Sequence, residues 1–306
     1  MSLAIISPGR NPKVWIDALT FHDPEIDIQV YPDITRPEEV QMALLWQHPP
    51  GYLDAFPNLK LISSLGAGVD HILSDPAIPR SVPIVRIVDE KLTWSMTNYV
   101  VMGVLNFHRQ LPRYQADQKR KVWDMSNPEI PTRIGVMGVG ALGGDVLDKL
   151  DYMGFPVFGF GFSEKEDFPY PYFSKDRLQE FLDEINVLVC LLPLTPDTEG
   201  ILNLDLFKKC KPGTFLINVA RGKHLVEEDL IPALEAGYIA GALLDVYRTE
   251  PLPTSHPFWE EKRIQLTPHI ASVTNPQAAA PQIIDNFKRL KANQPLFNLV
   301  NRQRGY

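Results

Sequence analysis

The chain has 306 residues, of which 44% are hydrophobic and 22% are charged, and a formal net charge of −7. A chain of this length exceeds what one hydrophobic core usually supports, so we expect a globular protein of two domains. The negative charge and the lack of a Lys/Arg-rich run argue against nucleic acid as a partner, because nucleic-acid binding depends on neutralising phosphates. The apolar run at residues 3–6 is too short for a signal peptide or a membrane span, so we expect no membrane partner.

Two cysteines, Cys190 and Cys210, are the only ones in the chain. They are too few for a disulfide scaffold, and neither has a Cys or His neighbour at the spacing of a metal site. Cys190 lies in the apolar run 187–192 and is expected to be a small buried hydrophobic residue. We therefore expect no bound metal and a cytoplasmic location.

Short apolar runs alternate with helical patterns along the whole chain, which is typical of parallel sheets with helices on both faces. The expected strands are 3–7, 28–31, 43–46, 60–65, 84–88, 134–137, 157–160, 187–192, 214–219, 241–246 and 264–267. Residues 95–121 predict one or two helices broken near Pro112, and residues 276–293 predict another helix. If this last helix returns to the first sheet, the first domain is discontinuous.

The predicted fold class is therefore α/β with two doubly wound parallel sheets. We expect a flavodoxin-like substrate domain at 1–96 and 274–306. A Rossmann-type dinucleotide-binding domain is expected at 97–273, inserted into the first.

A glycine-rich turn in the middle of the chain is its most informative feature. Gly138, Gly140 and Gly143 have the G-x-G-x-x-G spacing and follow the apolar run 134–137 directly. The first glycine permits a tight turn, the second permits approach of a pyrophosphate, and the third permits close packing of the following helix. The spacing alone also occurs in ordinary loops. A helical pattern and a second apolar run follow here, and together they complete the β-α-β unit that the motif requires.

Three further strand ends carry polar side chains capable of chemistry. Arg221 follows the run 214–219, Glu250 follows 241–246, and His269 follows 264–267. Each alone is more often a surface charge, a solvated loop residue or a structural histidine. All three are expected at the sheet edge that also carries the glycine turn, which is where α/β sheets bind ligands. A guanidinium to hold a carboxylate, an imidazole to transfer a proton and a carboxylate to orient the imidazole form a coherent set.

The sequence resembles the D-2-hydroxyacid dehydrogenase family over essentially its whole length. The motifs that carry the resemblance are LGAGVD at 65–70, the glycine turn, LPLTPDT at 192–198, NVARG at 218–222, LDVYRTEPLP at 244–253 and TPHIA at 267–271. A narrower likeness to the bacterial glyoxylate/hydroxypyruvate reductases within this family depends on LLWQHPP at 44–50 and the closing RGY at 304–306.

The resemblance implies reduction of a small 2-oxo acid, glyoxylate or hydroxypyruvate, to the D-2-hydroxy acid by hydride transfer from NAD(P)H. It makes Arg221, Glu250 and His269 catalytic, with Arg221 binding the substrate, His269 delivering the proton and Glu250 holding His269. It also implies substrate-binding residues, which are Leu65, Gly66, Ala67 and Gly68 in a loop that grips the carboxylate, with Trp46 and Trp94 as candidate pocket walls. Core or interface packing explains the two tryptophans about as well.

The resemblance also implies the cofactor site. Its residues are Gly138, Gly140, Ala141, Leu142, Gly143, Ser163, Lys165, Leu192, Pro193, Thr198, Val219, Ala220 and Asp245. Gly161 stands where many NAD-preferring relatives carry an acid, and the arginine of NADP-binding relatives is also missing. Ser163 and Lys165 remain as candidate phosphate ligands, with Glu164 opposing them, so NADP(H) is favoured over NAD(H).

Three questions stay open at this point. One alternative within enzymes is another substrate, for example phosphoglycerate or a longer 2-oxo acid. A phosphorylated substrate requires extra cationic groups, and the sequence shows no such cluster near Gly66. A non-catalytic NAD(P)-sensing protein of the same fold is a second alternative. The resemblance further implies a homodimer with the helices of 95–121 at the interface.

Overall fold

The structure is a computed structural model that describes residues 1–305 and divides into two compact units. Unit 1 contains Met1–Leu92 and the segment from Val273 onward, and unit 2 contains Thr93–Ser272. The expected functional division at residues 96 and 274 stays a prediction. Tyr306, the last residue of the closing RGY motif, lies outside the described residues. Across residues 1–305, no helix has both the length and the apolar character needed to cross a lipid bilayer.

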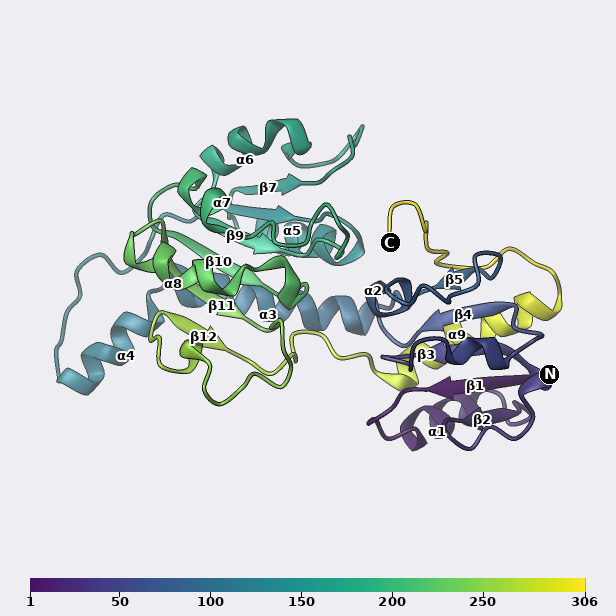
Figure 1. Cartoon of the computed structure of the whole chain (residues 1–306). Coiled ribbons are helices and arrows are strands. Elements are labelled where there is room, and N and C mark those ends of the chain that lie inside the picture. Colours follow the sequence, from purple (N-terminus) through teal and green to yellow (C-terminus); the bar gives the residue numbers. More distant parts are fainter. Residues whose placement is uncertain (306) are drawn as a thin grey trace. The chain divides into compact units, whose positions relative to one another are not determined.

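Unit 1 is built on a five-stranded parallel sheet in the order β2-β1-β3-β4-β5 (Figure 1). This is the flavodoxin-like order, in which the direction of winding across the sheet reverses between β1 and β3. Its strands are β1 (Ser2–Ile6), β2 (Ile28–Val30), β3 (Val40–Leu45), β4 (Leu61–Ser64) and β5 (Ile84–Val85). Its helices are α1 (Lys13–His22), α2 (Asp70–Leu73) and α9 (Pro276–Lys291).

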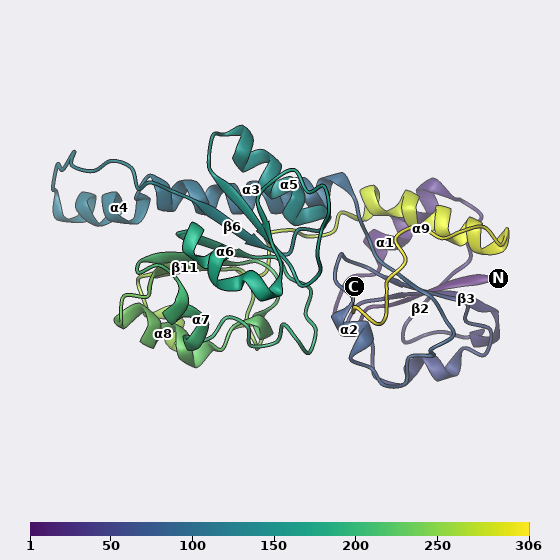
Figure 2. The same cartoon turned by 90° about the horizontal axis from the view of Figure 1, so that it is seen from above.

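The last helix returns to the first sheet and completes unit 1, an arrangement that the sequence alone left open. α9 packs beside α1 on one face of the sheet (Figure 2). Its buried side chains include Ile283, Ile284 and Phe287, which recur at helical spacing and form an apolar stripe. Unit 1 is therefore discontinuous in sequence.

Unit 2 is built on a seven-stranded parallel sheet in the order β12-β11-β10-β9-β6-β7-β8. The order is that of a Rossmann fold, with the direction of winding reversing between β6 and β9. Its strands are β6 (Ile134–Met137), β7 (Val157–Phe160), β8 (Tyr172–Phe173), β9 (Val187–Cys190), β10 (Thr214–Asn218), β11 (Ile239–Leu244) and β12 (Ile264–Leu266). Its helices are α4 (Leu111–Arg120), α5 (Ala141–Tyr152), α6 (Leu178–Glu184), α7 (Leu204–Lys209) and α8 (Glu227–Glu235), together with most of α3 (Glu90–His108).

Helices cover both faces of this second sheet. Apolar side chains of α3 and α5 form one core with the strands, and those of α6, α7 and α8 form the core on the other face. Gly103 allows α3 to approach closely, because a Cβ there would lie 2.6 Å from Leu243 Cδ2. Every strand buried on both faces reads as an apolar run, as expected for a covered parallel sheet.

Three details differ from the sequence expectations. Helix α3 begins at Glu90 rather than at residue 95, and the break before α4 falls at Arg109 and Gln110 rather than at Pro112. Gln110 adopts a left-handed φ of 55°, and Pro112 lies in the first turn of α4, where its missing N–H costs nothing. The two-residue strand β8 was not predicted, because two residues carry no periodic signal.

Candidate active site

The glycine turn joins β6 to α5 and lies against the segment that follows β9. Gly138 has a φ of 99°, and a Cβ there would lie 2.5 Å from the Leu191 carbonyl oxygen and 2.7 Å from the Leu192 nitrogen. A Cβ on Gly143 would lie 2.0 Å from the Gly138 carbonyl oxygen. Both positions therefore require glycine, whereas nothing lies within 4 Å of a Cβ built on Gly140. The turn thus leaves open space beside Gly140 at the start of α5. Helix N-termini are general binding sites for phosphate groups.

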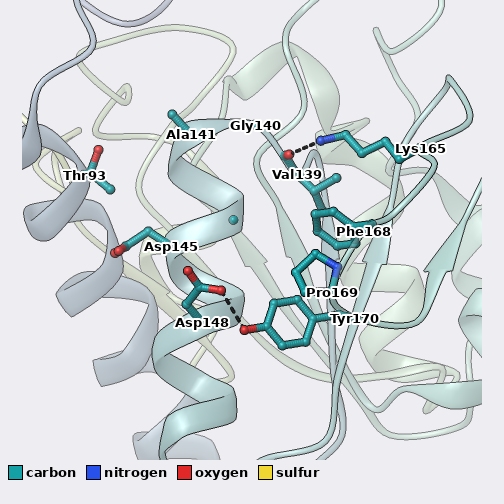
Figure 3. A pocket seen from close by; sticks show the side chains of 11 residues that line it. Thr93, Val139, Gly140, Ala141, Asp145, Asp148, Lys165, Phe168, Pro169 and Tyr170 are labelled. Atoms are coloured by element: carbon teal, nitrogen blue, oxygen red, sulfur yellow. Dashed lines mark hydrogen bonds between the residues drawn. The ribbon is translucent and has the colours of Figure 1, made fainter.

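A hollow of about 620 Å³ opens beside this turn (Figure 3). Gly140 and Ala141 line it, together with Lys165 from the loop after β7. The Lys165 ammonium donates a hydrogen bond to the Val139 carbonyl at 2.8 Å and lies 5.1 Å from the centre of the Phe168 ring. The structure therefore places Lys165 at the glycine turn. Ser163 is exposed in the same loop, and its carbonyl accepts a hydrogen bond of 2.5 Å from Tyr172.

The remaining residues assigned to the cofactor follow β9 and β10. Leu192, Val219 and Ala220 are buried at these two strand ends. The buried hydroxyl of Thr198 donates to the Pro193 carbonyl at 2.7 Å and closes the loop that begins at Leu192. Leu142 lies half-buried in the first turn of α5. These residues and the glycine turn all lie at the carboxyl edge of one sheet, but their contacts with a dinucleotide stay predictions.

Arg221 follows β10 and is fixed by its neighbours. Its backbone N–H donates to His224 Nδ1 at 3.2 Å, and its guanidinium donates to the Ala220 carbonyl at 2.6 Å. The buried His224 also reaches the Pro193 carbonyl through Nε2 at 3.3 Å. Gly222 permits close packing on the next strand end, since a Cβ there would lie 1.8 Å from the Tyr247 carbonyl carbon. The sequence gives no signal for His224 other than its spacing of three residues from Arg221.

Glu250 and His269 are in direct contact. His269 Nδ1 lies 2.8 Å from Glu250 Oε2, and the other carboxylate oxygen accepts the Tyr247 N–H at 3.1 Å. Burial alone raises the pKa of the Glu250 carboxyl. The hydrogen bonds from His269 and Tyr247 and the charges of His269 and Arg221 outweigh this and lower that pKa below its ordinary value. Glu250 is thus an ionised partner for an imidazolium, and Arg221 is close enough to act on its charge.

The backbone that carries His269 is held in an unusual conformation. His269 has a φ of 56°, which a residue other than glycine adopts at a cost and keeps only where its surroundings enforce it. The buried Asp245 carboxylate accepts the N–H groups of Ile270 and Ala271, each at 2.8 Å, and the Thr267 hydroxyl at 2.6 Å. Tyr99 of α3 reaches the same hydroxyl at 2.5 Å. Asp245 therefore fixes the turn on both sides of His269, and its assignment to the cofactor stays a prediction.

The loop at residues 65–69 lies in unit 1, after β4. The buried Ser64 hydroxyl donates to the Gly68 carbonyl at 2.7 Å and accepts the Gly66 N–H at 3.1 Å. The Gly66 N–H is thus already used, while the N–H groups of Ala67 and Gly68 make no hydrogen bond within residues 1–305. If this loop grips a carboxylate, Ala67 and Gly68 supply the donors.

The two tryptophans differ in their surroundings. Trp46 follows β3 in unit 1 and lies half-buried against Gly66, where a Cβ would be 2.8 Å from its ring. Trp94 lies on α3 with 68% of its surface exposed. Trp46 thus packs on the loop at residues 65–69, and pocket roles for both tryptophans stay predictions.

Comparison with known proteins places this chain among related enzymes. Residues 101–271 match the family described as D-isomer specific 2-hydroxyacid dehydrogenase, NAD binding domain. Glyoxylate/hydroxypyruvate reductase A of Serratia proteamaculans is 39% identical, and that of Yersinia enterocolitica is 37% identical, each over 100% of both chains.

Solved structures that are similar to this chain belong to the same group of enzymes. A D-isomer specific 2-hydroxyacid dehydrogenase from Xanthobacter autotrophicus in complex with NADPH has a TM-score of 0.94 at 36% identity, covering 100% of this chain and 99% of that one. An NADPH-dependent glyoxylate/hydroxypyruvate reductase from Sinorhizobium meliloti in complex with NADP and sulfate has a TM-score of 0.92 at 35% identity, covering 100% of both chains. The chain belongs to the D-isomer specific 2-hydroxyacid dehydrogenase family.

Proposed function

We propose that this protein is an NADPH-dependent reductase of small 2-oxo acids, glyoxylate or hydroxypyruvate, and yields the D-2-hydroxy acid. The observation that carries the proposal is the contact of 2.8 Å between Glu250 and His269, with the charge of Arg221 acting on the same carboxylate. The relatives named for this activity match the full chain, and neighbouring structures contain NADP or NADPH.

The residues of unit 2 fit a dinucleotide. The space beside Gly140, the N-terminus of α5 and the ammonium of Lys165 form a cradle for phosphate. When bound, NADPH supplies the hydride that reduces the carbonyl carbon of the substrate. We assign the preference for NADPH over NADH to Lys165 and Ser163, since Gly161 offers no carboxylate to repel a 2′-phosphate.

The chain's own residues then have distinct tasks. The Arg221 guanidinium binds the carboxylate and the carbonyl oxygen of the substrate, which polarises the carbonyl. His269 has Nδ1 turned to Glu250, so its Nε2 is the atom that delivers a proton to that oxygen. The Glu250 carboxylate stabilises the imidazolium until the proton is delivered. The loop at residues 65–69 of unit 1 is assigned to substrate binding, and unit 1 is thereby the substrate domain.

The assembly and location are also proposals. Exposed apolar side chains follow α4, with Trp123 92% exposed and Met125 77% exposed, and these support a homodimer joined through unit 2. Both cysteines are buried free thiols, and burial raises the pKa of Cys190 and of Cys210 to about 12. Thiols kept in this form suit a reducing compartment, so we place the protein in the cytoplasm. Cell fractionation tests this location.

A spectrophotometric panel tests the proposed activity. Glyoxylate, hydroxypyruvate, pyruvate and 3-phosphohydroxypyruvate are each offered with NADPH and with NADH to the wild type and to His269→Gln. We expect the first two to be reduced with NADPH at the highest kcat/KM of the panel, and pyruvate to be reduced more slowly. In His269→Gln, kcat should fall by at least about a hundredfold, the usual scale for a lost general acid, while NADPH still binds in a fluorescence titration. A wild type that binds NADPH but oxidises it with no 2-oxo acid would instead support a sensing protein.

A further inference from the structure

Arg10 lies in a segment of unit 1 that the proposed catalytic set does not use. It follows β1, as Trp46 follows β3 and Gly66 follows β4. These three strands are parallel neighbours, so all three segments leave the sheet at its carboxyl edge. The sheet changes its direction of winding between β1 and β3, and open α/β sheets bind ligands outside the carboxyl ends at that point. Arg10 therefore stands at the position in unit 1 where the fold itself favours a ligand.

The Arg10 side chain is held beside the predicted carboxylate loop. Its guanidinium carbon lies 4.2 Å from the centre of the Trp46 ring, a stacking geometry that orients the planar group. The edge of the same ring lies against Gly66, and the His71 ring meets it edge-on at 4.7 Å. Trp46 thus connects the guanidinium with the loop through direct contacts within unit 1.

Within residues 1–305, the charge of Arg10 has no counterion. No carboxylate in residues 1–305 lies within ion-pair distance of it, unlike Arg36 of the same unit, which pairs with Asp27 and Glu39. The residue as a whole is exposed, so a ligand can reach it, but partial burial of the guanidinium lowers its pKa from the ordinary value. A partly desolvated cation without an acidic partner interacts more favourably with an anion than a fully hydrated one does.

We propose that Arg10 is a specificity residue that binds an anionic substituent on carbon 3 of the substrate, so that 2-oxo acids with a second carboxylate belong to the substrate range. The inference rests on the proposed function, in which Ala67 and Gly68 donate to the first carboxylate. The Arg10 guanidinium is thus a cationic group near Gly66, and the sequence alone did not predict it there. The chemistry is a charge-assisted hydrogen bond, which typically contributes more than a neutral one and discriminates against substrates that lack the acceptor.

Oxaloacetate and pyruvate provide the test, because they differ only by the carboxylate on carbon 3. We expect the wild type to have a kcat/KM for oxaloacetate at least about tenfold above that for pyruvate, the discrimination expected from one charge-assisted contact. In Arg10→Leu this ratio should fall to near one. Arg10→Lys keeps the charge but not the planar stack, and it should retain part of the preference. Arg36→Leu removes a paired arginine at the opposite edge of the sheet and should leave the ratio as in the wild type.

The outcomes separate the two proposals. Equal ratios in the wild type and Arg10→Leu, with both proteins reducing glyoxylate, overturn the role of Arg10 and leave the proposed function standing. Lack of turnover with every 2-oxo acid overturns both. Circular dichroism melting of each variant detects misfolding. Should Arg10→Leu fail to fold, the ratio of kcat/KM for oxaloacetate to that for pyruvate in Arg10→Lys decides. A ratio below that of the wild type in Arg10→Lys, with a wild-type ratio in Arg36→Leu, supports the proposal. A wild-type ratio in Arg10→Lys overturns it.

Discussion

A contact of 2.8 Å between Glu250 and His269 determines what the site can do at a given pH. The Glu250 carboxyl has a pKa below its ordinary value, so it stays ionised through the neutral range and loses its charge only as the pH falls through that lowered value. A group of this kind contributes stability above its unfolded pKa and loses that contribution on acidification. The carboxylate charge beside His269 is therefore present throughout the neutral range.

Glu250→Gln tests this dependence. In the proposed mechanism the His269 imidazolium delivers the proton, and loss of the Glu250 carboxylate removes the charge that stabilises this imidazolium. We expect kcat/KM for glyoxylate reduction at neutral pH to fall by at least about tenfold, the scale of one lost charge-assisted hydrogen bond to the imidazolium. The measurement is a pH profile of glyoxylate reduction. Glu228→Gln is the matched control, since the Glu228 side chain is 73% exposed and, among residues 1–305, pairs only with Arg248, at 3.6 Å. Coincident profiles for the wild type and Glu250→Gln would contradict the assigned role.

At the scale of elements, the packing of α5 onto its own N-terminal turn depends on one glycine. A Cβ on Gly143 would lie 2.0 Å from a backbone oxygen that no side-chain rotation can move, whereas a Cβ on the adjacent Gly144 would meet nothing within 4 Å. The two residues share a helix, a neighbour and an amino-acid type. They differ only in the space that a methyl group would enter.

Alanine substitutions at these two positions should therefore have opposite signs. We expect Gly143→Ala to lower the free energy of unfolding by about 1–3 kcal/mol through overpacking, and to weaken NADPH binding because the turn must move. We expect Gly144→Ala to raise the free energy of unfolding by about 0.5–1 kcal/mol, since alanine is the better helix former. Urea unfolding of both variants gives the comparison. A stable Gly143→Ala that binds NADPH as the wild type does would show that the turn tolerates a side chain.

The elements themselves were largely predictable, and the contacts between them were not. Apolar runs predicted the strands at 134–137 and 157–160 with the bounds that the structure has, because buried parallel strands have no polar positions to blur the pattern. The contact between Tyr99 and Thr267 joins residues 168 positions apart, and no local pattern marks it. No local pattern marks the stacking of Arg10 on Trp46 either, because the two residues follow different strands. Local sequence predicts which residues begin a strand or turn, whereas a supporting contact depends on which strand ends become neighbours.

At the scale of the whole molecule, two kinds of exposed apolar side chain have to be explained. Phe21 on α1 of unit 1 is 74% exposed and stands on a surface helix, where single apolar residues are common. Trp123 is 92% exposed and has Val122 and Met125 close by in sequence, at 47% and 77% exposure. Several apolar residues in one exposed segment are typical of an interface rather than of a free surface.

The proposed homodimer predicts a different effect for each of these aromatic residues. Trp123→Glu introduces a charge where the dimer needs a desolvated apolar contact, and an unpaired buried charge costs several kcal/mol. In sedimentation velocity we expect the wild type at twice the 34.6 kDa of one chain and Trp123→Glu largely at the mass of one chain. Phe21→Glu should sediment as the wild type does. A dimer that survives in Trp123→Glu would move the interface away from this segment, and a monomeric wild type would remove the need for a covered surface there.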